Sequence, residues 1–141
     1  MKIVKNNCYG GFGLSLEAEK EYLKLKGKEA FFYKQTKYTH RDKVNEYIRV
    51  DDLKDNFLFV SCLTVDLGKT TDNLKYGDGE YFSSRDIPRN DPDLITVIDK
   101  LGEKANGRCA SLSIIEIPDD VEWEVDEYDG LETIREKHRS W

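Results

Sequence analysis

Residues 122–141, EWEVDEYDGLETIREKHRSW, carry the clearest structural signal in the chain. At their centre lies Asp129-Gly130, the preferred middle of a two-residue hairpin turn, because both positions need a positive φ that Gly adopts freely and Asp tolerates. Residues on either side alternate with the period of two that gives a strand two chemically distinct faces. The stretch therefore predicts a C-terminal β-hairpin, with Trp123 and Val125 facing the core or a subunit interface and the neighbouring acids facing water.

Two helices are predicted upstream of the hairpin. The first is capped by Ser15 and ends at Gly27. The second has Asp91 as its N-cap and ends at Asn106-Gly107, with Gly102 as the alternative end. The residues expected on the buried face of the first helix are Leu14, Ala18, Tyr22 and Leu25.

Strands are predicted for the β-branched and aromatic runs. The most apolar run, 57–65, predicts a buried strand, and 46–50 predicts an edge strand. Further strands are expected at 2–9, 30–38 and 109–117. This order of elements predicts an α+β domain in which two main helices pack on one face of a mixed or antiparallel sheet.

Bulk composition restricts the possible partners. The 141 residues are enough for one domain with its own core. A net charge of −6 disfavours nonspecific binding to nucleic acid polymers or to an anionic membrane surface. No apolar run has the length of a bilayer span and the first residues lack a signal peptide, which predicts a cytoplasmic protein. The three cysteines Cys8, Cys62 and Cys109 form no Cys-x-x-Cys pair and are predicted to be small buried hydrophobic residues.

Residues with catalytic or metal-binding spacing are missing from the sequence. The two histidines have no partner at the spacing of a metal box or a nucleophile motif. Gly68-Lys69-Thr70 lacks the earlier glycine of a nucleotide-binding loop. The glycine-rich segment 9–13 before the first helix is equally compatible with a tight turn and with a phosphate-binding loop. We therefore expect no catalytic residue, no cofactor and no metal.

Nucleotide recognition fits the remaining side chains better. Arginine holds phosphates through forked, charge-assisted hydrogen bonds, and bases stack on aromatic rings. Arg135 and Arg139 are the expected phosphate contacts, because they lie close together in a cationic, aromatic-flanked terminus. The alternative is that the arginines form surface ion pairs with nearby acids, each contributing little. The full set of candidate ligand-binding residues is Phe12, Arg89, Arg108, Trp123, Tyr128, Arg135, His138 and Arg139.

Several longer motifs resemble a small family of bacteriophage and prophage proteins that includes the first described Thoeris anti-defence protein. The motifs are CYGGFGLS at 8–15, RNDPDLI at 89–95, LGEKANGR at 101–108, IEIPDDVEWEVDEYDG at 115–130 and the closing HRSW. The resemblance covers residues 1–38 and 85–141 and leaves approximately 39–84 as a variable insertion in a single signal-sequestering domain, 1–141.

The resemblance implies a non-enzymatic sponge in the cytoplasm of the infected bacterial host. Such a protein sequesters the glycocyclic ADP-ribose made by bacterial TIR-domain proteins, so that the Thoeris effector is never activated. The resemblance also implies a homo-oligomer, either a dimer or a hexamer, with the pocket near a subunit boundary. Some members also hold cyclic di- or trinucleotides at a separate site.

Two other classes of function stay open on the sequence. One is a nucleotide-processing hydrolase that acts on the same signal; it would release altered ligand, whereas a sponge releases the ligand unchanged. The other is a phage inhibitor that docks on a host protein through the hairpin, which would capture a protein and no small molecule.

Overall fold

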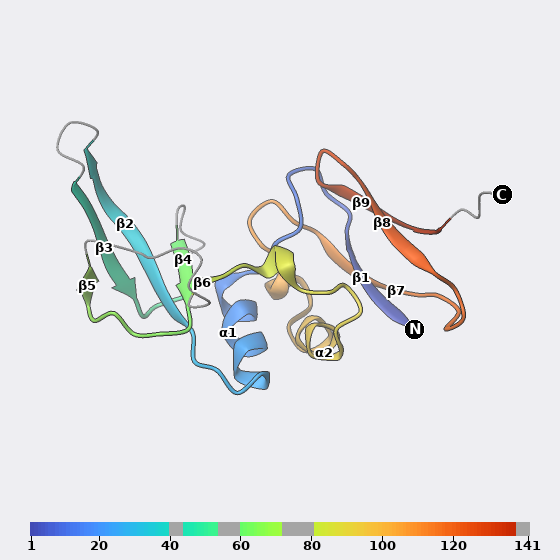
Figure 1. Cartoon of the computed structure of the whole chain (residues 1–141), viewed down its shortest axis with the longest axis horizontal. Coiled ribbons are helices and arrows are strands. Elements are labelled where there is room, and N and C mark those ends of the chain that lie inside the picture. Colours follow the sequence, from blue (N-terminus) through green and yellow to red (C-terminus); the bar gives the residue numbers. More distant parts are fainter. Residues whose placement is uncertain (40–43, 54–59, 72–80, 138–141) are drawn as a thin grey trace. The chain divides into compact units, whose positions relative to one another are not determined.

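The computed structural model describes residues 1–39, 44–53, 60–71 and 81–137 (Figure 1). These residues form two α-helices and nine strands, and every pairing between strands is antiparallel. The expected α+β class with a C-terminal hairpin is confirmed, and the sheets are antiparallel rather than mixed.

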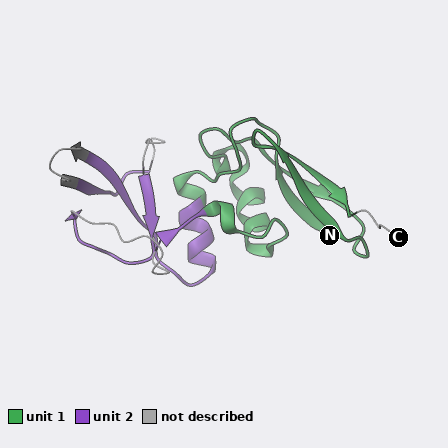
Figure 2. Ribbon diagram, turned by 45° about the horizontal axis from the view of Figure 1, so that its top comes forward, with its two compact units in different colours: residues 1–18, 84–141 green, residues 19–83 purple. Residues whose placement is uncertain are grey.

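The chain divides into two compact units (Figure 2). The first unit combines Met1–Ala18 with Ser84–Trp141, and the second is Glu19–Ser83. The second unit therefore contains nearly all of the insertion expected at 39–84, but it already begins at Glu19, within the first predicted helix.

In the first unit, strands β1 (Lys2–Asn6) and β7 (Leu112–Glu116) form a two-stranded sheet. Helix α2 (Pro92–Leu101) packs against both strands. Ile3 and Val4 are neighbours, so their side chains point to opposite faces of β1, and both are fully buried. Strand β1 is therefore covered on both faces.

The hairpin consists of β8 (Trp123–Tyr128) and β9 (Leu131–Glu136), and β9 lies against β1. Both turn residues have a positive φ, 48° at Asp129 and 90° at Gly130, which confirms the turn predicted from Asp-Gly. Trp123 is half-buried, whereas Val125 is 36% exposed in the single chain.

The predicted helix starts are confirmed by their caps. Ser15 Oγ accepts a hydrogen bond from the backbone N–H of Ala18 (3.2 Å), and an Asp91 carboxylate oxygen accepts one from the N–H of Asp93 (2.9 Å). The preferred end of the second helix is wrong and the alternative is right. Helix α2 stops at Gly102, where φ is 57°, and the chain continues as a 3-10 turn, Gly102–Ala105. A second 3-10 turn, Ser84–Asp86, precedes α2.

One predicted core position of helix α1 (Leu16–Leu25) is wrong. Leu25 is 48% exposed, and Leu23 is buried instead. The backbone N–H of Lys28 donates to Leu23 O (2.9 Å), so the chain after Gly27 folds back beside Leu23 and leaves the last helical residue open. Leu14, Ala18 and Tyr22 are buried as predicted.

The second unit contains a five-stranded sheet in the order β5-β3-β2-β4-β6. Tyr33, Tyr47 and Leu63 form its buried cluster. The prediction of an edge strand at 46–50 is wrong, because β3 lies between β5 and β2. Within the buried strand expected at 57–65, Cys62 and Leu63 are buried. The strands are β2 (Phe31–Thr39), β3 (Val44–Val50), β4 (Val60–Leu63), β5 (Thr70–Thr71) and β6 (Tyr81–Phe82).

Of the three cysteines, only Cys62 is buried as expected. Cys8 is half-buried and Cys109 is exposed, because both lie in the loops that join β1 and β7 to the rest of the first unit. Within the described part of the chain, no helix is long and apolar enough to cross a membrane.

Candidate functional site

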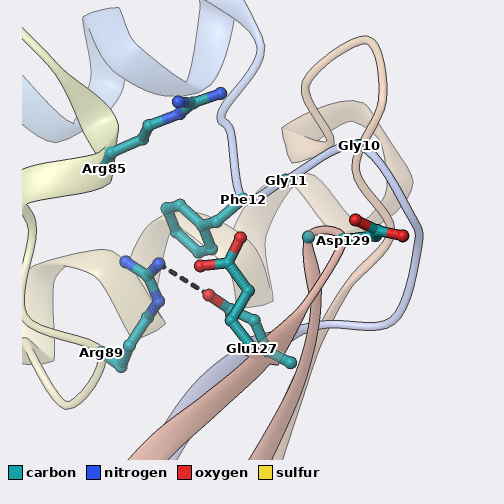
Figure 3. Close-up of a pocket in the computed structure, with 9 residues that line it drawn as sticks. Gly10, Gly11, Phe12, Arg85, Arg89, Glu127 and Asp129 are labelled. Atoms are coloured by element: carbon teal, nitrogen blue, oxygen red, sulfur yellow. Dashed lines mark hydrogen bonds and ion pairs between the residues drawn. The ribbon is translucent and has the colours of Figure 1, made fainter.

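The first unit contains a pocket of about 440 Å³, here called the hairpin pocket (Figure 3). Three segments that are far apart in the sequence form its walls: the glycine-rich loop after β1, the segment that leads into α2, and the turn of the C-terminal hairpin. The lining residues are Gly10, Gly11, Phe12, Arg85, Arg89, Glu127, Asp129, Gly130 and Glu132.

Backbone contact between two glycine segments closes one end of the pocket. The N–H of Gly10 donates to Asp129 O (2.9 Å). A Cβ at Gly130 would overlap the backbone nitrogen of Gly11, so the hairpin turn and the loop approach each other more closely than any side chain permits. The glycine-rich segment 9–13 is therefore a packed turn, as one of the two alternatives expected, and three of its residues line the pocket. Phosphate binding by this loop stays a prediction.

Asn6 holds the loop and the hairpin together. Its side chain is fully buried, and its Nδ2 donates to the carbonyls of Cys8 and Gly130, both at 2.8 Å. Its Oδ1 accepts from the N–H of Ser111 (2.9 Å) and of Cys8 (3.3 Å). Since a buried amide left without partners is costly, this network favours a single arrangement of the pocket wall.

Arg89 and Glu132 form a buried ion pair in the floor of the pocket. Arg89 Nη2 donates to Glu132 Oε2 (2.9 Å), and the two side chains are only 13% and 3% exposed. Arg89 Nη1 also donates to Ile87 O (3.1 Å), and the guanidinium lies 3.5 Å from the centre of the Phe12 ring. Arg89 Nε is buried without a hydrogen-bond partner among the described residues.

The same pair also completes the free edge of β1. The N–H of Val4 donates to Arg89 O (2.8 Å), and the N–H of Asn6 donates to Glu132 Oε1 (2.9 Å). In an antiparallel strand alternate N–H groups point outward, and here a backbone carbonyl and a carboxylate take the place of another strand. Arg89 and Glu132 are therefore part of the structure of the unit as well as of the pocket wall.

Arg85, Glu127 and Asp129 have less restricted side chains, and all three are exposed. Arg85 makes no ion pair with the residues that the structure describes, and its Nη2 is 3.4 Å from the point that a Cβ at Gly11 would occupy. Glu127 lines the pocket from the hairpin, while the Asp129 carboxylate is turned away from the arginines (Figure 3). Among the described residues that line the pocket, Arg85 is therefore the cation without an ion pair, and Glu127 is a carboxylate without one.

Two of the eight candidate residues, Phe12 and Arg89, lie together in the pocket. Phe12 is 5% exposed, so its ring mainly supports Arg89. Tyr128 is 72% exposed and lies in the chain between the lining residues Glu127 and Asp129.

Three further candidates, Arg108, Trp123 and Arg135, lie outside the pocket lining. Arg108 is exposed, and Trp123 is on β8 opposite Glu136. Arg135 Nε donates to Glu124 (2.8 Å) and its Nη1 is 3.6 Å from Asp126, which is the surface ion pairing considered as the alternative. His138 and Arg139 fall outside the described residues.

Sequence reasoning missed Arg85, Asn6 and Glu127. Arg85 lies four residues before Arg89 in the turn that leads to α2, and this repeated arginine was an available signal. Glu127 could not be separated from the other alternating acids of the hairpin. Asn6 lies in a short strand with no turn or cap signal around it, so no local pattern indicated its role.

Comparisons with protein-family models, with curated proteins and with solved structures find no match to this chain. Among the residues described, no group of three or more His, Cys, Asp or Glu side chains is arranged to hold a metal ion.

Proposed function

We propose that this chain is a phage anti-defence sponge. It binds glycocyclic ADP-ribose in the cytoplasm of the infected bacterial host, holds it without cleavage, and so prevents activation of the Thoeris effector. The resemblance of the sequence motifs suggests this function, and we assign the ligand to the hairpin pocket.

The observation that carries the proposal is that separate motifs meet at one pocket. The motif at 8–15 contributes the glycine loop and Phe12, the motif at 89–95 contributes Arg89, and the motif at 115–130 contributes Glu127 and the hairpin turn. A shared binding site gives a physical reason for these motifs to occur together in one chain.

The chemistry of the pocket supports a small-molecule ligand. Its volume of about 440 Å³ lies within the roughly 300–1,000 Å³ typical of ligand sites. Arg85 can donate to a phosphate, and Glu127 can accept from hydroxyl groups. A sponge needs affinity for its ligand and does not need to stabilise a transition state, so these binding groups suffice for it.

The test is recovery of the ligand. Purified protein is incubated with glycocyclic ADP-ribose, separated from free ligand and heated, and the released nucleotide is analysed by chromatography. We expect intact glycocyclic ADP-ribose in proportion to protein, whereas protein denatured before incubation should retain none. Linear or hydrolysed products in proportion to protein would indicate the hydrolase instead.

Native mass spectrometry of the same complex tests the remaining parts of the proposal. We expect a homo-oligomer, a dimer or a hexamer, that carries bound nucleotide, and the same measurement with cyclic di- and trinucleotides tests a second ligand class. A captured host protein with no bound nucleotide would favour the protein-binding inhibitor.

A further inference from the structure

The two arginines of the hairpin pocket differ in what they can offer a ligand. Arg89 is 13% exposed, is paired with Glu132 and is covered by the Phe12 ring. Arg85 is exposed and has no ion pair within the described part of the chain. A ligand that took Arg89 would leave the carboxylate of Glu132, 3% exposed, without its counter-ion. Arg85 is therefore the guanidinium available to a bound anion.

Gly11 keeps the guanidinium of Arg85 close to the loop. A Cβ at Gly11 would lie 3.4 Å from Arg85 Nη2, so the guanidinium is in van der Waals reach of the loop at this position. The φ of Gly11 is 104°, which also favours glycine at this position. The backbone of the loop and the arginine side chain thus form one wall together (Figure 3).

Glu127 occupies a position that is unfavourable for a carboxylate. It lies directly opposite Glu132 in the hairpin ladder, an arrangement in which like charges repel. Both oxygens of Glu132 are already used, by the Asn6 N–H and by Arg89, whereas Glu127 lines the pocket with no ion pair to the described residues. A ligand with phosphate groups alone would be repelled by Glu127, while a ligand that also brings hydroxyl donors would be held by it.

We propose that Arg85 donates hydrogen bonds to a phosphate group while Glu127 accepts one from a ribose hydroxyl, so that the hairpin pocket selects a phosphorylated ribose over a bare phosphate. Carboxylates are used in this way for ribose hydroxyls in dinucleotide-binding folds. The inference rests on the proposed function for the identity of the natural ligand, and on the charges of the pocket for the roles of the two residues.

Isothermal titration with four probes tests these roles: glycocyclic ADP-ribose, ADP-ribose, ribose 5-phosphate and inorganic pyrophosphate. For each ribose-containing probe that binds the wild-type protein, Arg85→Ala should lower the affinity by about tenfold or more. Arg85→Lys should lower it by less, because lysine keeps the positive charge but loses the forked pair of guanidinium donors. Glu127→Gln should weaken the same probe by roughly fivefold to tenfold, since charged acceptors form the stronger hydrogen bonds. Lys104→Ala is the control, because it removes an exposed positive charge of the same unit outside the pocket and should leave affinity unchanged.

The sign of the Glu127→Gln effect is decisive. If the pocket recognised phosphate alone, removing this negative charge would tighten binding of pyrophosphate and of every phosphorylated probe. Tighter or unchanged binding of the ribose-containing probes in Glu127→Gln, or unchanged binding in Arg85→Ala, overturns the inference.

The four probes also separate this inference from the proposed function. If glycocyclic ADP-ribose binds and its affinity is unchanged in both the Arg85 and the Glu127 variants, the roles of these residues are contradicted while the sponge function still stands. Binding of ADP-ribose or ribose 5-phosphate, sensitive to both residues, without binding of glycocyclic ADP-ribose removes the sponge and leaves the inference. Failure of all three ribose-containing probes to bind the wild-type protein removes both.

Discussion

Arg89 and Arg135 form ion pairs of nearly equal length in very different surroundings. The Arg89–Glu132 pair measures 2.9 Å with side chains 13% and 3% exposed, and the Arg135–Glu124 pair measures 2.8 Å with side chains 48% and 37% exposed. An exposed pair is screened by water, whereas removing one partner of a buried pair leaves a charge that cannot be solvated.

We therefore expect a large loss of stability when Arg89 is replaced by alanine and a small one when Arg135 is replaced. Arg89→Ala should reduce the free energy of unfolding by about 3 kcal/mol or more, because the Glu132 carboxylate would lose its counter-ion and the edge of β1 would be disturbed. Arg135→Ala should change it by about 0.5 kcal/mol or less. Urea unfolding of the two variants beside the wild type gives both values, and equal losses would contradict the role assigned to burial.

Arg135→Ala also tests the expectation that the basic C-terminus holds phosphate. A phosphate contact would be worth roughly 2 kcal/mol, or about thirtyfold in affinity. Arg135 pairs with Glu124 and Asp126 and does not line the hairpin pocket, so we expect its removal to leave the affinity for glycocyclic ADP-ribose unchanged. A thirtyfold loss measured by titration would return Arg135 to the binding site.

At the level of elements, the hairpin turn contributes to the pocket by its backbone. Gly130 has φ 90°, and a Cβ there would overlap the backbone of Gly11. Gly27, after α1, has a similar φ of 75° but open space where a Cβ would be. Both glycines therefore adopt a positive φ, but only Gly130 is in close contact with another segment of the backbone.

Comparison of Gly130→Ala with Gly27→Ala separates the two effects. Gly27→Ala should cost about 1–2 kcal/mol, the penalty of a left-handed conformation for a residue with a Cβ. Gly130→Ala should cost more, because the loop must also move away from the turn, and it should lower ligand affinity by displacing the pocket wall. Denaturant unfolding and titration of both variants measure this, and equal effects would show that close approach of the two segments is unimportant.

At the scale of the whole molecule, the division of the chain into two compact units falls between Ala18 and Glu19, within α1, and again between Ser83 and Ser84. In the second unit, burial raises the pKa of the Glu19 carboxyl from 4.5 to about 8, and a hydrogen bond with Cys62 offsets part of this rise. Burial, together with the nearby Glu19 charge, also raises the pKa of the Cys62 thiol.

This carboxyl makes stability depend on pH. Between about pH 4.5 and about pH 8 the folded protein keeps the Glu19 proton, whereas the unfolded chain releases it. The contribution of Glu19 to the free energy of unfolding is therefore fully present below pH 4.5 and is lost as the pH rises toward 8. The slope is at most about 1.4 kcal/mol per pH unit for one group. Glu19→Gln should therefore gain stability relative to the wild type as the pH increases.

Urea unfolding at pH 5, 6.5 and 8 measures the difference between Glu19→Gln and the wild type. The exposed Glu17, on the same helix, provides the control variant Glu17→Gln, whose stability profile should run parallel to that of the wild type. A parallel profile for Glu19→Gln as well would contradict a folded carboxyl that retains its proton.

The sequence by itself determined the elements whose causes are local. The Asp129-Gly130 turn and the Ser15 and Asp91 caps each depend on neighbours within a few residues, and all are present in the structure. The helical spacing of Leu14 and Ala18 is also local, and the structure buries both. Helix ends were less certain, because Gly102 and Asn106-Gly107 both carry a local stop signal and only packing distinguishes them.

Phe12 and Arg89 were expected from the sequence, but only the tertiary structure decided which other residues join them in the pocket. Asn6, Arg89 and Glu132 are separated by up to 126 residues, yet they are joined by hydrogen bonds of 2.9 Å. Such contacts depend on how β1, the segment before α2 and the hairpin pack together, which no local pattern records. For the same reason the sequence indicated the cationic C-terminus, where arginines are close along the chain, and missed Arg85, which reaches the pocket only because the folded chain brings it beside Gly11.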